Sequence, residues 1–218
     1  LAERKRQMEL KHLEEQFNPH FVFNVLETLR YEILIDGKKA SEMVVAFANL
    51  LRYSINYGNT RVELQKDIEY INDYLLLQKM RYNRRLTYHI EIPEELLNCR
   101  VPKLLLQPVV ENALIHGIST KESGGVIQVK IYREDRFVIV KVMDNGKGMS
   151  QEKVEQVLAD IKKKDITGFR RVGLANVLNR IRLVYGEEYG GTVYSCQNMF
   201  TCVELRLPVQ VGLQGTEV

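Results

Sequence analysis

The chain has few cysteines and no long apolar run, and each shortage excludes a class of protein. Its 218 residues include three cysteines, Cys99, Cys196 and Cys202, none of them in a Cys-x-x-Cys pair. An odd number of scattered cysteines argues against a disulfide framework and indicates a reducing compartment. No run of about 18 apolar residues occurs, so we do not expect these residues to span a membrane.

The chain also lacks a strong net charge. Its 31 Lys and Arg residues against 28 Asp and Glu residues give a formal charge of +3, which is no reason to expect a nucleic-acid partner. We expect no signal peptide, and the opening residues read as the continuation of a longer protein. The apolar content of 45% is ordinary for a globular protein, and the length allows two small domains or one large one.

What is present begins with helices. Apolar residues at helical spacing predict a first helix and a turn after it, then a second helix over 41–57 with Ser41 as its N-cap, and a third over 64–82. One hairpin cannot bury all the apolar stripes of the first two helices. These stripes are Leu10, Leu13, Phe17 and Phe21, and Val44, Phe47, Leu51 and Ile55. We therefore expect a homodimer through residues 1–57, with two hairpins in a four-helix bundle.

After residue 85 the pattern becomes one of short strands and helices. "RLTYHIEI" alternates like a strand, and "GGVIQVKIYRED" with "RFVIVKVMD" predicts an antiparallel pair across a tight turn. "GGTVYSC" and "TCVELRLP" are expected as the last strands. The irregular order predicts a mixed sheet with helices on one face. The fold class is therefore α+β: a helical hairpin followed by an α/β sandwich.

Two motifs that contain a carboxylate stand out in this second part. In "VVENALIHG", Glu111 and Asn112 lie in an apolar helix, one turn before His116. They are either polar residues on the solvent side or oxygen ligands for Mg²⁺ and its waters. In "VMDNGKGM", Asp144 ends a strand and precedes two glycines, at 146 and 148. This is either an ordinary glycine turn or a carboxylate that accepts a hydrogen bond from an exocyclic amine, beside a backbone that a flat ring can approach.

Two further motifs concern phosphate. In "RRVGLANV", Gly173 precedes a helix whose first amides can hold phosphate oxygens, although helices often begin with glycine. In "NPHFVFN", His20 follows a proline that removes a helix hydrogen bond and bends the helix there. Asn24 lies one turn further on the same side. The alternatives are a core histidine with a packing proline and an exposed nucleophile, since a histidine ring is largely neutral near pH 7.

The motifs E-N-x-x-x-H-G, D-x-G-x-G-M and G-L-x-N-V occur in this order, after "QFNPHFVFN" and "LQKDIEYINDYLLLQKMRY". With them the chain resembles the cytoplasmic part of a LytS/YesM-like sensor histidine kinase, over residues 7–209. The resemblance implies a dimerisation and phosphotransfer hairpin over 1–60, a helical connector over 61–84, and an ATP-binding domain of the GHKL (Bergerat) type over 85–210.

The resemblance also implies roles for single residues. His20 is implied as the phosphoacceptor, with Asn24 beside it. Asn112 is implied to bind Mg²⁺, with Glu111 ordering water or acting as a base, and Asp144 is implied to read the adenine amine. The remaining residues implied to bind the nucleotide are His116, Gly146, Gly148, Arg171, Gly173, Leu174 and Thr201.

The implied activity is ATP-dependent autophosphorylation, followed by transfer to an aspartate in the receiver domain of a response regulator. The full-length protein is implied to be a bacterial membrane protein anchored before residue 1. Two departures from the family pattern, at Arg171 and Thr201, are expected at the phosphate end of the pocket, where they predict weaker ATP binding unless the arginine pairs with phosphate. A nucleotide-binding scaffold with weak or no kinase activity therefore stays open. So does an ATPase of the gyrase or chaperone type, which does not need "NPHFVFN".

Overall fold

The computed structural model describes residues 19–55, 60–82, 85–118, 124–162 and 174–210. The chain divides into two compact units, and the division falls between Asn72 and Asp73, inside helix α4 (Leu64–Arg81). The first unit therefore includes the second half of α4, and the second unit includes its first half. Compact units describe packing only, so the division into functional domains at residues 60 and 84 stays a prediction.

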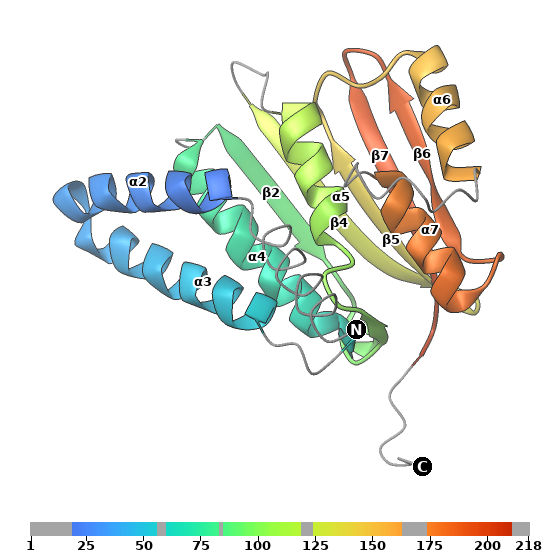
Figure 1. Ribbon diagram of the computed structural model, residues 1–218, viewed down its shortest axis with the longest axis horizontal. Helices are drawn as coiled ribbons and strands as arrows, with labels where there is room; N and C mark the ends of the chain where they lie inside the picture. The colour runs from blue at the N-terminus through green and yellow to red at the C-terminus, as the bar shows by residue number, and fades with distance from the viewer. Residues whose placement is uncertain (1–18, 56–59, 83–84, 119–123, 163–173, 211–218) are drawn as a thin grey trace, which may run out of the picture. The chain divides into compact units, whose positions relative to one another are not determined.

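The first unit is built on a hairpin of two helices, α2 (Pro19–Ile35) and α3 (Gly37–Ile55) (Figure 1). The buried side chains of α3 recur at helical spacing and are Ala40, Met43, Ala46, Leu50 and Ser54. Small residues in this row let the two helices approach closely. The stripe that contains Val44 and Ile55 lies beside this row, and these two side chains are half exposed, at 50% and 52%.

The turn between these helices differs from the prediction. Helix α3 begins at Gly37, so Ser41 lies in its second turn and is not the N-cap. Asp36 takes that role, because its Oδ1 accepts a hydrogen bond from the backbone amide of Lys39 at 3.2 Å. The same amide and the Lys39 ammonium hold the pKa of Asp36 below its ordinary value. The expected bend before His20 involves residues 1–18, which lie outside the described residues, as do Leu10, Leu13 and Phe17.

The second unit is built on a five-stranded mixed sheet. Its strands are β2 (Leu86–Glu91), β4 (Gly125–Glu134), β5 (Phe137–Asp144), β6 (Gly190–Cys196) and β7 (Phe200–Pro208). They lie in the order β2-β4-β5-β7-β6, with β2 parallel to β4 and every other pair antiparallel. Strands β1 (Arg61–Glu63) and β3 (Arg100–Pro102) form a separate antiparallel pair. The predicted antiparallel pair of β4 and β5 is confirmed.

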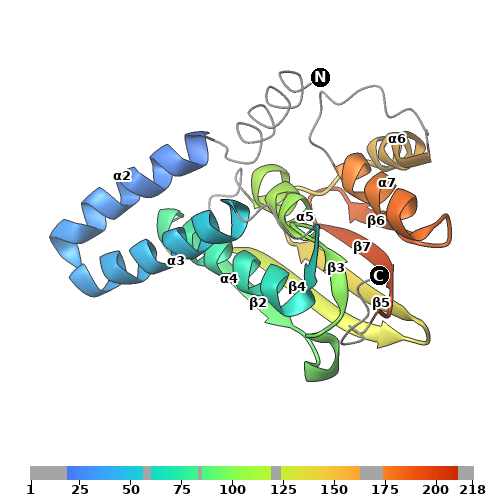
Figure 2. The same cartoon turned by 60° about the horizontal axis from the view of Figure 1, so that its bottom comes forward.

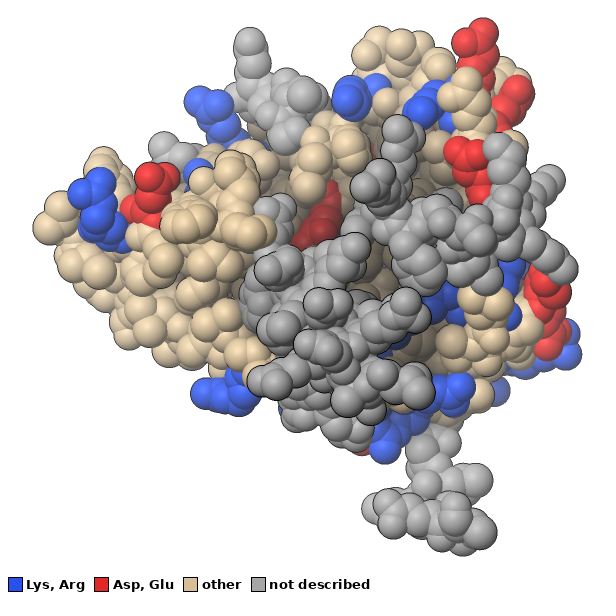
Figure 3. Space-filling view, in the orientation of Figure 1, with Lys and Arg blue, Asp and Glu red and all other residues tan. Residues whose placement is uncertain are grey.

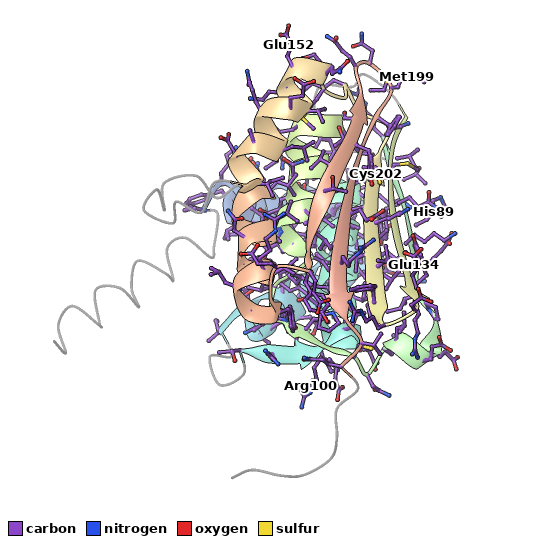
Figure 4. All side chains as sticks on the ribbon, turned by 90° about the vertical axis from the view of Figure 1, so that its right-hand side faces the viewer. His89, Arg100, Glu134, Glu152, Met199 and Cys202 are labelled. Atoms are coloured by element: carbon purple, nitrogen blue, oxygen red, sulfur yellow. The ribbon has the colours of Figure 1, made fainter. Side chains whose placement is uncertain are left out.

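Helices cover one face of this sheet, as predicted. They are α5 (Gln107–Asn112), α6 (Gln151–Lys162) and α7 (Leu174–Tyr185) (Figures 1 and 2). Burial alternates along β4, where Ile127, Val129 and Ile131 are fully buried while the residues between them are more exposed. This alternation is the signature of a sheet with one face in the core and one in solvent. In Figure 4 side chains such as His89 project from the open side of the sheet.

Leu178 of α7 packs against the sheet. It is fully buried, and a Cβ on Gly191 of β6 would overlap its Cδ2, so the glycine leaves room for the leucine. The α7 side chain of Leu183, in contrast, is 68% exposed.

We predict that Leu178→Ala lowers the free energy of unfolding by about 2–5 kcal/mol, because it leaves a cavity between helix and sheet. Leu183→Ala makes the same change on the exposed side of the helix and should stay within about 0.5 kcal/mol of the wild type. Urea unfolding followed by circular dichroism measures both. Equal losses in the two variants would contradict this packing of α7.

Candidate functional site

His20 lies exposed on α2, next to the side chain of Asn24. The Nδ2 atom of Asn24 is 3.1 Å from Nδ1 of His20 and 3.4 Å from its Nε2. A neutral imidazole has one protonated and one unprotonated nitrogen, so the amide N–H donates to the nitrogen that lacks the proton. The contact therefore orients the ring through its unprotonated nitrogen, which is the nucleophilic one.

The residue after His20 is fixed by helix α4 within the same unit. The ring of Phe21 lies against that of Tyr74, with centroids 5.1 Å apart and a tilt of 38°. Tyr74 is buried, and its hydroxyl accepts a hydrogen bond from Nε2 of Gln78 at 2.9 Å. Phe23, two residues after Phe21 on α2, is 67% exposed. The backbone beside His20 is thus held by one aromatic contact while the histidine ring stays accessible.

In the second unit, Asp144 is buried at the end of β5. Its Oδ1 accepts a hydrogen bond from the amide of Gly146 at 2.9 Å. A Cβ on Gly117 would overlap the carboxylate of Asp144, and a Cβ on Gly146 would overlap the backbone of Gly117. The amide of Lys147 also donates to the carbonyl of Gly117 at 3.2 Å. Only glycine at both positions allows this three-way approach, so the motifs "ENALIHG" and "DNGKG" meet at Asp144.

The neighbouring strands add hydroxyl groups beside Asp144. Thr201 of β7 is its register partner, and Ser195 of β6 is the register partner of Thr201. Their hydroxyl oxygens are 3.0 Å apart, and Oγ of Ser195 accepts a hydrogen bond from the amide of Met149 at 2.8 Å. Sequence reasoning selected Thr201 but missed Ser195, because strand register alone brings the two together.

Gly148 has a packing role that the sequence did not reveal. Its φ is +61°, a conformation that other residues rarely adopt, and a Cβ would overlap the carbonyl of Cys196. The amide of Asn198 donates to the carbonyl of Lys147 at 2.6 Å. The glycine therefore docks the loop after Asp144 onto the turn between β6 and β7, and a ring-binding surface is not needed to explain it.

Glu111 and Asn112 lie at the end of α5, where the helix continues as a π-helical turn over Ala113–Ile118. Such turns are rare and often mark functional sites. Both side chains are half-buried, and Oε1 of Glu111 accepts a hydrogen bond from Nε2 of Gln107 at 2.8 Å. Burial raises the pKa of the Glu111 carboxyl above its ordinary value, and the Gln107 hydrogen bond opposes this shift. His116, on the π-helical turn, is exposed.

The remaining predicted residues divide into two groups. Leu174 begins α7 and is buried, so it contributes to the core at the start of that helix. Arg171 and Gly173 lie outside the described residues, and with them the expected phosphate-binding segment.

The described groups fit a magnesium-bound adenine nucleotide. A buried strand-end carboxylate suits an exocyclic amine, and Glu111 with Asn112 offers the hard oxygen atoms that Mg²⁺ prefers. Magnesium commonly takes one or two protein oxygens and fills its other positions with water and substrate phosphates, so adjacent residues on one helix end are sufficient.

We predict that Glu111→Gln stabilises the protein progressively as the pH rises above 4.5, the ordinary pKa of this carboxyl. A carboxyl whose pKa is raised by folding binds more protons in the folded than in the unfolded state. The free energy of unfolding of the wild type therefore falls between pH 4.5 and the raised pKa. Glutamine does not titrate, so the variant lacks this fall in the free energy of unfolding over the same pH range. Thermal unfolding at a series of pH values measures the difference. Near pH 4 both side chains are neutral, which supplies the internal control; a difference that stays constant with pH would contradict the shift.

Comparisons with known proteins identify the family of the chain. Residues 8–86 match the family model described as "Histidine kinase", and residues 101–211 match that described as "Histidine kinase-, DNA gyrase B-, and HSP90-like ATPase". The sensor protein kinase HptS of Staphylococcus aureus, in strains bovine RF122 / ET3-1 and USA300, is 32% identical over 209 residues, or 96% of this chain. The chain spans 40% of the length of these relatives.

Solved structures show the same fold. Two structures of the catalytic domain of histidine kinase ThkA cover 69% of this chain and 95% and 97% of their own chains. Their TM-scores are 0.50 and 0.52, each at 17% sequence identity. The two family models together account for most of the chain, and the second matches the unit that holds Asp144. The chain therefore belongs to the histidine kinases, and its mixed-sheet unit is an ATPase domain of the kind found in histidine kinases, DNA gyrase B and HSP90.

Proposed function

We propose that this chain is the kinase core of a two-component sensor, which phosphorylates itself on His20 at the expense of ATP. The observation that carries the proposal is an exposed histidine, oriented by Asn24, in a chain that also contains a glycine-walled carboxylate at Asp144. An ATPase of the gyrase or chaperone type would need the second feature only. The relatives' names describe sensor kinases, which supports the same reading.

We assign the base of the nucleotide to the end of β5. Asp144 accepts a hydrogen bond from the adenine amine, and Gly117 and Gly146 hold its carboxylate in place. Because Thr201 pairs with Asp144 in the sheet, we place it at the base end of the pocket and not at the phosphate end expected from the sequence. The phosphates are assigned to Arg171, Gly173 and Leu174 at the start of α7, together with His116 from the π-helical turn.

We assign Mg²⁺ to Asn112, with Glu111 ordering a water molecule beside it. The ion supplies charge neutralisation for the phosphates. The hydrogen bond from Gln107 fixes one oxygen of Glu111, which directs the carboxylate along the helix end. A carboxyl whose pKa is raised is also a better proton acceptor, so Glu111 is the candidate base for the proton that leaves the His20 ring.

The transfer itself needs only positioning and charge neutralisation. The unprotonated ring nitrogen of His20 forms a bond to the γ-phosphorus while the bond from that phosphorus to the bridging oxygen breaks, and ADP leaves. Asn24 frees this nitrogen by turning its amide towards the incoming phosphoryl oxygens. In the second step, an aspartate oxygen of a receiver domain bonds to the same phosphorus as its bond to His20 breaks. The acceptor, its orienting amide and the base-reading carboxylate are all present, which favours an active kinase over a silent scaffold.

The full-length protein is proposed to be a bacterial membrane sensor, with this chain on the cytoplasmic side. The support is the family and the greater length of the relatives. Within the described ranges, none of the helices has the length and apolar character needed to cross a bilayer.

We also propose that the chain acts as a homodimer through its helical hairpin. Several large apolar side chains of α2 and α3 are at least 46% exposed, namely Phe23, Leu26, Val44, Val45 and Ile55. On the face seen in Figure 3, uncharged side chains cover most of the hairpin, with a few charged ones near its end. A second copy would remove this surface from water, and burial is worth roughly 25 cal/mol per Å² of apolar area.

We predict that His20→Gln abolishes incorporation of label from γ-labelled ATP and leaves nucleotide binding unchanged. The wild-type label should be labile in acid and stable in base. His89→Gln removes another exposed histidine, from β2, and should label normally. Label that persists on His20→Gln would move the acceptor to another residue, with His12 and His116 next in line.

We predict that Gly117→Ala weakens ATP binding by about 1–3 kcal/mol, because the added methyl group displaces the carboxylate that a charged hydrogen bond requires. Gly37→Ala is the matched control, since a Cβ at Gly37 meets nothing within 4 Å. Isothermal titration with ADP and a non-hydrolysable ATP analogue measures both. Wild-type affinity in Gly117→Ala would remove Asp144 from the role of adenine reader.

Val44→Asp tests the dimer. Val44 is half exposed in the single chain, so a charge there disturbs the fold of one copy less than a charge at the more buried Phe47. An unpaired charge in a bundle core is costly, so Val44→Asp should produce monomers at micromolar concentration in light scattering. Asn49→Asp adds the same charge to the same helix, about 140° around its axis from Val44, and should remain dimeric. A wild-type chain with a monomer mass would overturn the bundle.

A further inference from the structure

Asp67 is a buried carboxylate that the proposed chemistry does not use. It lies in the first half of α4 with no exposed surface, yet it contacts a segment nearly 40 residues away in the chain. Its Oδ1 accepts a hydrogen bond from the amide of Leu104 at 2.8 Å, and its Oδ2 accepts one from the amide of Leu106 at 2.9 Å. Both oxygens therefore hold the backbone directly before α5.

That backbone adopts a conformation that the local sequence does not favour. Leu104 has a φ of +57°, in the left-handed region where a leucine is strained. Such strain persists only where the surroundings impose it, and it clusters at functional sites. The hydrogen bond to Asp67 is a contact that imposes it, because it fixes the direction of the Leu104 amide.

Helix α5 depends on this support. It has only six residues, and helices so short are unstable by themselves. Leu106 is its N-cap residue and supplies no side-chain hydrogen bond to the first turn. The position of the helix is therefore set by the packing of its buried Val109 and Val110 and by the two amides that Asp67 holds.

The charge of Asp67 has a nearby counterpart in Lys103. Burial lowers the pKa of the Lys103 ammonium, and the negative charge of Asp67 opposes this shift. The attraction between the Lys103 ammonium and the Asp67 carboxylate offsets part of the free-energy cost of burying the carboxylate.

We propose that Asp67 is a positioning residue of the kinase: by fixing the turn over 104–106 from α4, it sets the place of Glu111 and Asn112 at the far end of α5. The inference rests on the proposed function, in which these two residues hold the magnesium and its water.

The test compares Asp67→Asn with Glu69→Gln in the full chain. Asparagine keeps the shape but offers one acceptor in place of two, whereas Glu69 is an exposed carboxylate on the same helix, paired with Lys66. The first measurement is hydrogen exchange over 103–118 in the nucleotide-free protein. The second is the affinity for a non-hydrolysable ATP analogue, measured with Mg²⁺ and in EDTA.

In Asp67→Asn we expect faster exchange over 103–118, and an affinity with Mg²⁺ about tenfold weaker, the effect of losing a hydrogen bond to a charged group. The affinity in EDTA, which depends on the base end of the pocket, should be unchanged, and Glu69→Gln should match the wild type in every measurement. Should Asp67→Asn fail to fold, Asp67→Glu takes its place, since it keeps the charge and shifts both acceptors by one methylene.

Equal losses with Mg²⁺ and in EDTA would overturn the inference, since they indicate general damage to the pocket. Unchanged affinity, or weaker binding without faster exchange, would overturn it too. If the wild type does not bind the analogue, the proposed function fails and the inference fails with it; if the wild type binds and Asp67→Asn binds equally well, the inference alone fails.

Discussion

The approach of the Asp144 carboxylate to the backbone of Gly117 is the contact on which the candidate site of the mixed-sheet unit depends. It brings the end of β5 against the π-helical turn that follows α5, and the second glycine, Gly146, closes on the same backbone. Any side chain at either position would push these elements apart. One steric constraint therefore sets both the place of the carboxylate and its separation from Glu111 and Asn112, which lie six and five residues before Gly117 on the same helical segment.

Helix α5, which carries the two residues proposed to hold magnesium and its water, is weak by itself. Its six residues are held at the beginning by Asp67 and at the end by the packing of the π-helical turn against β5. Both supports come from elsewhere in the chain. Such support from two separate elements suits the proposed magnesium site, because it positions a short helix that could not hold its place alone.

The proposed phosphoacceptor depends on local structure instead. His20 stands on a long helix, and its partner Asn24 is one turn away, so their contact depends on helix geometry alone. The tertiary contribution is the packing of Phe21 on Tyr74, which fixes the backbone and leaves the ring in solvent. An exposed, orientable ring is what a group needs when it must first receive a phosphoryl group and then present it to another protein.

Local periodicity in the sequence determined most of the elements: three helices at the beginning, alternating strands β4 and β5, and a mixed sheet covered on one face. Motif order was sufficient to select His20, Asn112 and Asp144 and to indicate the family. Contacts between residues distant in sequence were beyond this reasoning. The N-cap was assigned to Ser41 and not Asp36, because several polar residues near a turn compete for that role. Strand register places Ser195 beside Thr201. Close packing brings Gly117 against Asp144 and lets Asp67 accept a hydrogen bond from the amide of Leu104. Only the folded chain brings those atoms together.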